Sequence, residues 1–136
     1  MIEFKDLIVH ADKRGYLSEL LRNDDRIFSG EFGQVLLSVV RKDIIKAFHL
    51  HKYQTDYTTC IKGKIMYAWA DEERVFNVAI LTGDNPKLIK TPPGIWHGYQ
   101  AIDDDAILIH VMDKVYNPDD VFSRDKNYYG DLWHKI

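Results

Sequence analysis

Short β-prone segments separated by turn residues recur along this chain, and this pattern constrains the fold more than any other feature of the sequence. The segments are rich in Val, Ile, Tyr, Thr and Phe, whereas Gly, Pro, Asn and Asp stand between them, without a helical period. They cover residues 3–9, 15–22, 33–41, 44–51, 57–70, 75–81, 87–94, 97–102 and 106–112. This spacing predicts an antiparallel all-β sandwich or barrel. A chain of 136 residues can bury a core, so we expect residues 1–136 to form one domain.

The segment 44–51 carries two histidines on alternate residues, His49 and His51. In a strand, side chains at alternate positions point to the same face, so both imidazoles should share a face with Ile45 and Ala47. Because Ile45 and Ala47 are apolar, we expect this face to be the inner one. Buried imidazoles need polar partners. The pair therefore predicts a polar site inside the barrel.

The composition excludes several classes of partner. Charged residues make up 29% of the chain and the formal net charge is −3, so a nucleic-acid surface is not expected. The first residues carry charges from Glu3 onward and contain no apolar run of signal or membrane length. The single cysteine, Cys60, is typical of a buried thiol in a reducing compartment. We expect a cytoplasmic protein that binds a small molecule, with neither nucleic acid nor membrane as a partner.

The two histidines belong to a longer pattern that resembles the cupin superfamily. His49 and His51 are followed by Asp56, where cupins usually have Glu, and then by Gly63. The sequence PPGIWH at residues 92–97 resembles the second cupin motif. The resemblance implies a cupin fold, which is a double-stranded β-helix or jelly-roll antiparallel barrel.

The cupin resemblance also implies an alternative in which the site holds a divalent transition metal. Imidazole and carboxylate suit Zn, Fe, Mn or Ni, although Asp56 is shorter than the usual Glu. The ligands would be His49, His51, Asp56 and His97.

More of the chain, from about residue 8 to residue 118, resembles one branch of the cupins, the dTDP-4-dehydrorhamnose 3,5-epimerases. The resemblance implies a cofactor-free enzyme of deoxysugar or surface-polysaccharide biosynthesis that acts on a dTDP-linked 4-keto-6-deoxy sugar. The matching segments are Asp12-Lys13-Arg14-Gly15 with Glu19, Phe32-Gly33-Gln34-Val35, Lys46-Ala47-Phe48-His49, Pro92-Pro93-Gly94 with His97, and Tyr116-Asn117-Pro118.

Residue roles follow from this resemblance. His49 matches the general base of the family. Arg14 matches an arginine that contacts the diphosphate, for which a planar guanidinium is suited, and Glu19 matches a glutamate that helps to hold the thymine. The other residues implied in substrate binding are Gln34, Lys46 and His97.

The sequence departs from the family at three positions. Lys46 stands in place of an arginine, which keeps the charge but loses the bidentate fork. The catalytic lysine of the family falls near residues 54–56, where no lysine is present, and its general-acid tyrosine falls on His110. Tyr116 matches a family tyrosine. His110 and Tyr116 are therefore both candidates for the acid.

His49, Leu50, His51 and Lys52 also resemble the H-x-H-K segment of dTDP-sugar 3,4-ketoisomerases, in which both histidines shuttle protons. Epimerisation and ketoisomerisation share enolisation beside a keto group, which suits neutral histidine. Three interpretations stay open: a metal-free epimerase or ketoisomerase, a metal-dependent cupin, and a relative that binds the nucleotide sugar without turnover. We also expect a homodimer, because cupin epimerases pair through their sheets and lend an N-terminal strand to the neighbour.

Overall fold

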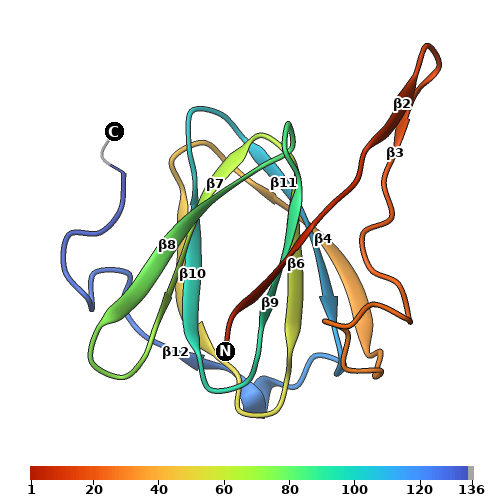
Figure 1. Cartoon of the computed structure of the whole chain (residues 1–136). Helices are drawn as coiled ribbons and strands as arrows, with labels where there is room; N and C mark the ends of the chain where they lie inside the picture. The colour runs from red at the N-terminus through yellow and green to blue at the C-terminus, as the bar shows by residue number, and fades with distance from the viewer. Residues whose placement is uncertain (135–136) are drawn as a thin grey trace.

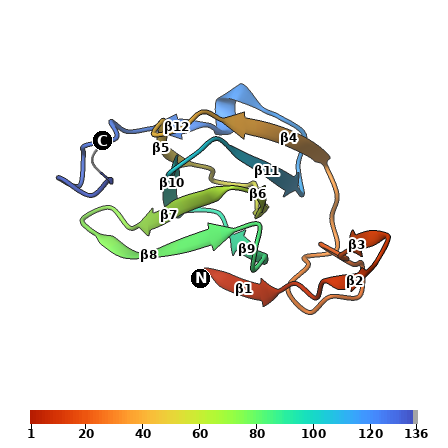
Figure 2. The same cartoon turned by 90° about the horizontal axis from the view of Figure 1, so that it is seen from above.

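Two five-stranded antiparallel sheets face each other across the interior of the molecule (Figures 1 and 2). The structure, a computed structural model, describes residues 1–134. Sheet A has the strand order β1 (Glu3–Asp6), β9 (Lys87–Thr91), β6 (Asp56–Lys62), β11 (Ala106–Met112) and β4 (Gln34–Val40). Sheet B has the order β12 (Phe122–Ser123), β5 (Ile45–Leu50), β10 (Trp96–Ala101), β7 (Lys64–Ala70) and β8 (Val75–Thr82). The predicted all-β jelly-roll barrel is confirmed.

A separate hairpin near the N-terminus projects from the barrel (Figure 1). It consists of β2 (His10–Asp12) and β3 (Gly15–Leu17), which pair only with each other. Gly15 has a φ of +139°, a conformation that residues with a Cβ rarely adopt. All six strand residues of the hairpin are exposed. Because an isolated two-stranded ribbon is marginally stable in water, this hairpin needs a surface to pack on.

Two of the predicted segments are longer than the strands that form. Only the first four residues of the segment 3–9 and the first three of the segment 15–22 are in strands. After β3, side-chain hydrogen bonds replace strand pairing. The carboxylate of Asp25 accepts hydrogen bonds from the backbone N–H of Arg22 at 2.7 Å and from the ammonium of Lys5 at 2.5 Å. Such local bonds favour turns over strands.

Along β6 and β11, the inward side chains change from polar to apolar. On β6, Asp56 and Thr58 line a cavity, whereas Cys60 is fully buried in the core. On β11, His110 lines the same cavity and Leu108 lies in the core. Burial raises the pKa of the Cys60 thiol to about 11, as expected for a buried cysteine. The apolar core therefore fills one end of the barrel and a polar cavity occupies the other.

A β-bulge in β5 changes which side chains face the interior. One residue of β10, Gly98, opposes two residues of β5, Ala47 and Phe48, so the alternation along β5 shifts by one. Lys46 consequently lines the cavity together with His49. Ile45 and Ala47 pack against a different apolar cluster, and the prediction that they share the inner face of His49 was wrong. Gly98 accommodates the bulge, since a Cβ there would lie 2.3 Å from the Cβ of Ala47.

The C-terminal residues after β11 run along the rim of the cavity and then over sheet B. Tyr116 and Val121, on either side of the 3-10 turn η1 (Pro118–Asp120), line the cavity. Arg124 exchanges two backbone hydrogen bonds of 3.0 and 2.9 Å with Phe48, and Trp133 packs on the Phe48 ring. The C-terminal segment thus fixes the bulged part of β5, which carries the central site residues.

Candidate functional site

A cavity of about 310 Å³ opens at the polar end of the barrel, between the two sheets. Side chains from both sheets and from the C-terminal segment form its wall. Seven of the nine site residues predicted from the sequence line it, namely Gln34, Lys46, His49, His51, His97, His110 and Tyr116. The structure therefore brings residues from β4, β5, β10, β11 and the C-terminal segment to one place.

The remaining two, Arg14 and Glu19, do not reach this cavity within one chain. Arg14 lies at the turn of the projecting hairpin, where its guanidinium forms an ion pair of 2.5 Å with Asp12. Glu19 lies in the loop after β3 and pairs with Arg22 at 3.0 Å. Both side chains are exposed, so the predicted contacts with a ligand in the cavity are not made by the same chain.

His49 is the histidine of the cavity whose ring forms no hydrogen bond with any part of the chain that the structure describes. Burial, reinforced by the nearby rings of His97 and His51, lowers the pKa of His49 to about 4. The ring is therefore neutral at pH 7, and a ring nitrogen is available to a ligand. A neutral imidazole with a free nitrogen can accept a proton as a general base.

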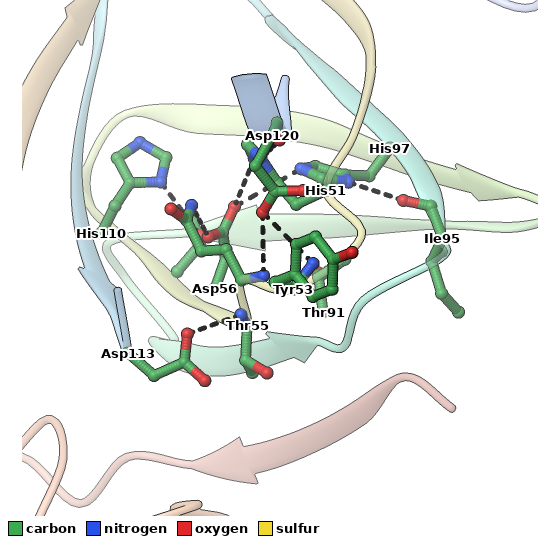
Figure 3. A network of polar contacts seen from close by, with 12 residues as sticks. His51, Tyr53, Thr55, Asp56, Thr91, Ile95, His97, His110, Asp113 and Asp120 are labelled. Atoms are coloured by element: carbon green, nitrogen blue, oxygen red, sulfur yellow. Dashed lines mark hydrogen bonds and ion pairs between the residues drawn. The ribbon is translucent and has the colours of Figure 1, made fainter. Parts of the chain in front are cut away.

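Asp56, His51 and His97 form a cluster (Figure 3). The His97 ring lies 5.4 Å from the ring of His49. The Oδ2 atom of Asp56 lies 3.7 Å from Nε2 of His51 and 3.5 Å from Nε2 of His97. The other oxygen accepts a hydrogen bond of 2.6 Å from the Gln54 amide. Burial raises the pKa of Asp56, but the hydrogen bond from His97 and the charges of both histidines outweigh it and hold that pKa below its usual range. The carboxylate is thus ionised.

Backbone carbonyls fix the orientation of both imidazoles in this cluster. Nδ1 of His51 donates a hydrogen bond of 2.8 Å to the carbonyl of Asp120, and Nδ1 of His97 donates one of 3.0 Å to the carbonyl of Ile95. Since a carbonyl only accepts, Nδ1 of each ring carries a proton, and Nε2 of each ring faces Asp56, to which it can donate a proton as imidazolium or beside which it can offer a lone pair as neutral imidazole.

This arrangement fits a cation, because three acceptor atoms converge. Ligands held 2.0–2.2 Å from one tetrahedral metal ion lie about 3.4 Å apart, close to the two distances from Asp56. Second-shell carbonyls of this kind are also common around metal-binding histidines. His51, Asp56 and His97 are therefore the possible metal ligands. His49, the fourth ligand of the metal alternative, lies outside this group.

Asp120, which the sequence did not single out, anchors the turn after β5 (Figure 3). Its carboxylate accepts hydrogen bonds from the backbone N–H groups of Lys52 at 2.7 Å and of Tyr53 and Gln54 at 3.2 Å each. Asp120 is buried, and its backbone carbonyl also orients His51. The only sequence signal for this residue was the acidic stretch after Pro118.

His110 lies on sheet A, across the cavity from the histidines of sheet B (Figure 3). Its Nε2 is hydrogen-bonded to the hydroxyl of Ser38 at 3.1 Å and its Nδ1 to the hydroxyl of Thr58 at 3.0 Å. Burial lowers the pKa of His110 to about 4. Because both ring nitrogens are occupied, His110 has none left with which to protonate a ligand directly.

Three tyrosines also line the cavity. Tyr116 lies at its rim and is 68% exposed, and its backbone N–H donates a hydrogen bond of 2.7 Å to the side chain of Gln34. Tyr67 and Tyr99 lie inside and were not assigned to the site from the sequence. The signal that points to Tyr99 is its position two residues after His97, on the same face of β10.

A family model described as dTDP-4-dehydrorhamnose 3,5-epimerase matches residues 3–127. The chain belongs to the dTDP-4-dehydrorhamnose 3,5-epimerase family. Among relatives of this epimerase-family chain, the spore coat polysaccharide biosynthesis protein SpsL of Bacillus subtilis is 31% identical over 125 residues, which are 87% of this chain and 82% of SpsL.

Two solved structures share the fold of this chain. The dTDP-4-dehydrorhamnose 3,5-epimerase from Sulfolobus tokodaii is 26% identical with a TM-score of 0.86, over 98% of this chain and 82% of that one. The 3'-monoepimerase ChmJ from Streptomyces bikiniensis, in complex with dTDP-quinovose, is 17% identical with a TM-score of 0.84, over 93% and 70% of the two chains.

Family membership confirms the resemblance found in the sequence and the predicted class of enzyme, an epimerase or isomerase of dTDP-linked sugars. Among residues 1–134, no helix is long and apolar enough to span a lipid bilayer. The cytoplasmic location and the absence of a nucleic-acid partner stay predictions.

Proposed function

We propose that this chain epimerises or isomerises a dTDP-linked 4-keto-6-deoxy sugar through an enolate, with His49 as the general base and without a metal ion. The proposal rests on the His49 ring, which is neutral, open to the cavity and not hydrogen-bonded to any group of residues 1–134. His49 removes a proton next to the C4 ketone, and His51, which His97 and Asp56 surround, assists the proton transfers. A donor in the cavity stabilises the enolate oxygen.

Binding of the diphosphate is assigned to cationic groups at the edge of the cavity. The exposed ammonium of Lys46 lies on the wall beside His49, and the side chain of Gln34 lies on the facing wall. Arg14, which is remote from the cavity of its own chain, would reach the cavity of a second subunit through the projecting hairpin. Glu19 would accompany it at the nucleoside end.

The outer face of sheet A supports a homodimer. Val35, Leu37 and Val39 on the edge strand β4 are 53%, 60% and 43% exposed, and they pair with apolar residues of β11. An edge strand with an exposed apolar face is a natural surface for a second copy. Packing of two such faces would bury this surface and place each hairpin beside the partner subunit. A monomer at micromolar concentration in sedimentation would contradict the homodimer.

Subunit complementation tests the shared site. A His49→Asn chain and an Arg14→Ala chain should each be weakly active alone. Refolded together in equal amounts, they should recover about one quarter of the wild-type sites, because half of the dimers are mixed and each mixed dimer contains one intact site. Activity that stays at the level of the separate variants after mixing would show that Arg14 does not serve the neighbouring cavity.

Deuterium incorporation tests the reaction. In heavy water with a dTDP-4-keto-6-deoxy sugar, the chain should introduce deuterium at C3 or C5, or move the keto group to C3, as nuclear magnetic resonance of the sugar would show. Enolisation is measured directly in this way, even when the final product is unknown. A chain that binds dTDP but incorporates no deuterium would be a binding protein instead.

A metal-dependent enzyme is the second candidate, favoured by the convergence of His51, Asp56 and His97. A bound ion would act there as a Lewis acid on the keto oxygen. The deuterium experiment, repeated with excess chelator, separates the two candidates. Exchange should be unchanged without the ion if the proposal is correct. Exchange that disappears with chelator and returns with added Zn²⁺, Mn²⁺ or Fe²⁺ would favour the metal enzyme.

A further inference from the structure

We propose that Tyr99 donates a proton to the face of the sugar opposite His49, and that Ser38, His110 and Thr58 form the relay that resupplies it. This inference rests on the proposed function, which requires a proton to leave one face of the carbon and, for inversion, to arrive at the other. Tyr99 supplies the proton for this second transfer, because both ring nitrogens of His110 are already hydrogen-bonded.

The position of Tyr99 suits this role. It lies on β10, two residues after His97, so its side chain enters the cavity from sheet B. Its ring stacks on Tyr67 with an interplanar angle of 13° and lies 6.0 Å from the ring of His110 on sheet A. Burial raises the pKa of Tyr99, and the Ser38 hydroxyl on sheet A partly offsets this effect, which places the phenol hydroxyl near Ser38. The phenol therefore crosses the barrel and places its hydroxyl at the wall that faces His49.

A continuous set of proton-carrying groups follows from that hydroxyl. Ser38 is bonded to Nε2 of His110 at 3.1 Å, and Nδ1 of the same ring is bonded to Thr58 at 3.0 Å. A hydroxyl both donates and accepts, and a neutral imidazole does so through its two nitrogens. All of these residues line the cavity, so the relay runs along the wall of sheet A and does not cross the apolar core.

The other two tyrosines of the cavity, Tyr67 and Tyr116, are less suited to donate this proton. The Tyr67 hydroxyl is bonded to the Thr91 hydroxyl at 2.7 Å, and the side chain is almost fully buried. Tyr116 is 68% exposed at the rim and has no link to His110 among the bonds of residues 1–134. Tyr99 is therefore the phenol that combines a place in the cavity with a connection to a relay.

Each proton transferred in this reaction has a donor and an acceptor. His49 takes the proton from the carbon as the C–H electrons become those of the enolate, and the enolate carbon then takes the Tyr99 proton from the other face. Ser38 passes a proton to the phenolate, Nε2–H of His110 passes one to Ser38, and Thr58 passes one to Nδ1 of His110. Water supplies Thr58 and removes the proton from His49. Proton exchange of the His110 ring with solvent then restores its Nε2–H tautomer, which returns the enzyme to its initial state.

Tyr99→Phe tests this inference. The variant should lose epimerised product by about 10²–10⁴-fold, the usual contribution of an acid catalyst. It should still incorporate deuterium without inversion, because His49 exchanges its proton with heavy water and returns deuterium to the same face. Tyr53→Phe, which removes the hydroxyl of an exposed tyrosine that does not line the cavity, is the control and should keep epimerisation within about threefold of wild type.

Ser38→Ala tests the relay and does not depend on whether the Tyr99 variant folds. It should lower kcat for epimerisation about tenfold with little change in KM, and Ser38→Thr should restore it, because the hydroxyl is what matters. If Ser38 had only a structural role, Ser38→Ala would lower deuterium exchange and inversion of the sugar carbon together.

These experiments distinguish failure of the Tyr99 inference from failure of the proposed function. If the wild-type chain incorporates no deuterium, the proposed function fails. If it does, and folded Tyr99→Phe epimerises at the wild-type rate or loses exchange together with inversion, this inference alone is overturned. Loss of inversion in Tyr116→Phe but not in Tyr99→Phe would assign the acid to the rim tyrosine.

Discussion

Replacement of His49 by Asn should lower deuterium incorporation by about 10²–10⁴-fold, the usual contribution of a well-placed general base. Asn keeps a similar size and polarity but cannot accept the proton. The affinity for dTDP should stay within about twofold, because the base acts at the sugar whereas Lys46 and Arg14 are assigned to the diphosphate. Isothermal titration with dTDP and exchange measured by mass spectrometry provide the two readouts.

His134→Asn is a suitable control for this experiment. His134 is an exposed histidine near the end of the described chain, and the two hydrogen bonds that involve it, both with Gln100, are made by its backbone. It should leave both exchange and dTDP affinity unchanged. If His49→Asn retains exchange within about tenfold of wild type, the base is another group, and His51 becomes the next candidate.

Local sequence patterns predicted most of the fold because each strand is bounded by turn residues. Gly63, with a φ of +80°, separates β6 from β7 within the predicted segment 57–70, and Gly94, with a φ of +84°, lies in the turn before β10. The pattern failed where contacts with other segments decide the backbone. The bulge in β5 depends on its pairing with β10 and on the space at Gly98, neither of which can be read from the local sequence.

The candidate site was predicted in part, for a related physical reason. Histidines stand out in a sequence because inward-facing imidazoles are unusual, so His49, His51 and His97 were found. Ser38 and Thr58 were not, because a Ser or Thr in a strand has no distinctive signal until its partner, here His110, is known. The metal alternative included His49 because spacing alone cannot show which of two alternate histidines approaches Asp56.

Arg14 and Glu19 illustrate a second reason why part of the site could not be predicted from the sequence. The family resemblance identifies them by local motif, but the structure of one chain places them on a hairpin and loop outside the cavity. Their assigned role therefore depends on a second subunit, which a local motif does not reveal. The exposed apolar face of β4 and the unsupported hairpin both favour that arrangement.

Asp120→Ala should destabilise the chain by about 2–4 kcal/mol, because three backbone N–H groups lose a charged acceptor in a buried turn. For a chain of this size, such a loss corresponds to a decrease of about 10 °C in Tm, measurable by circular dichroism. Asp120→Asn should be nearly as harmful, since its amide group would bring a donor toward the N–H groups of residues 52–54.

Asp119→Ala provides the matched control, because Asp119 is the neighbouring carboxylate in the same 3-10 turn but is exposed. Its removal should change the unfolding free energy by less than about 0.5 kcal/mol. Equal effects of the two variants would mean that the turn tolerates the loss by admitting water. If Asp120→Ala is selectively destabilised, the C-terminal segment is part of the site: the residue that anchors the turn after β5 also supplies the carbonyl that orients His51, so stability and imidazole position depend on the same contact.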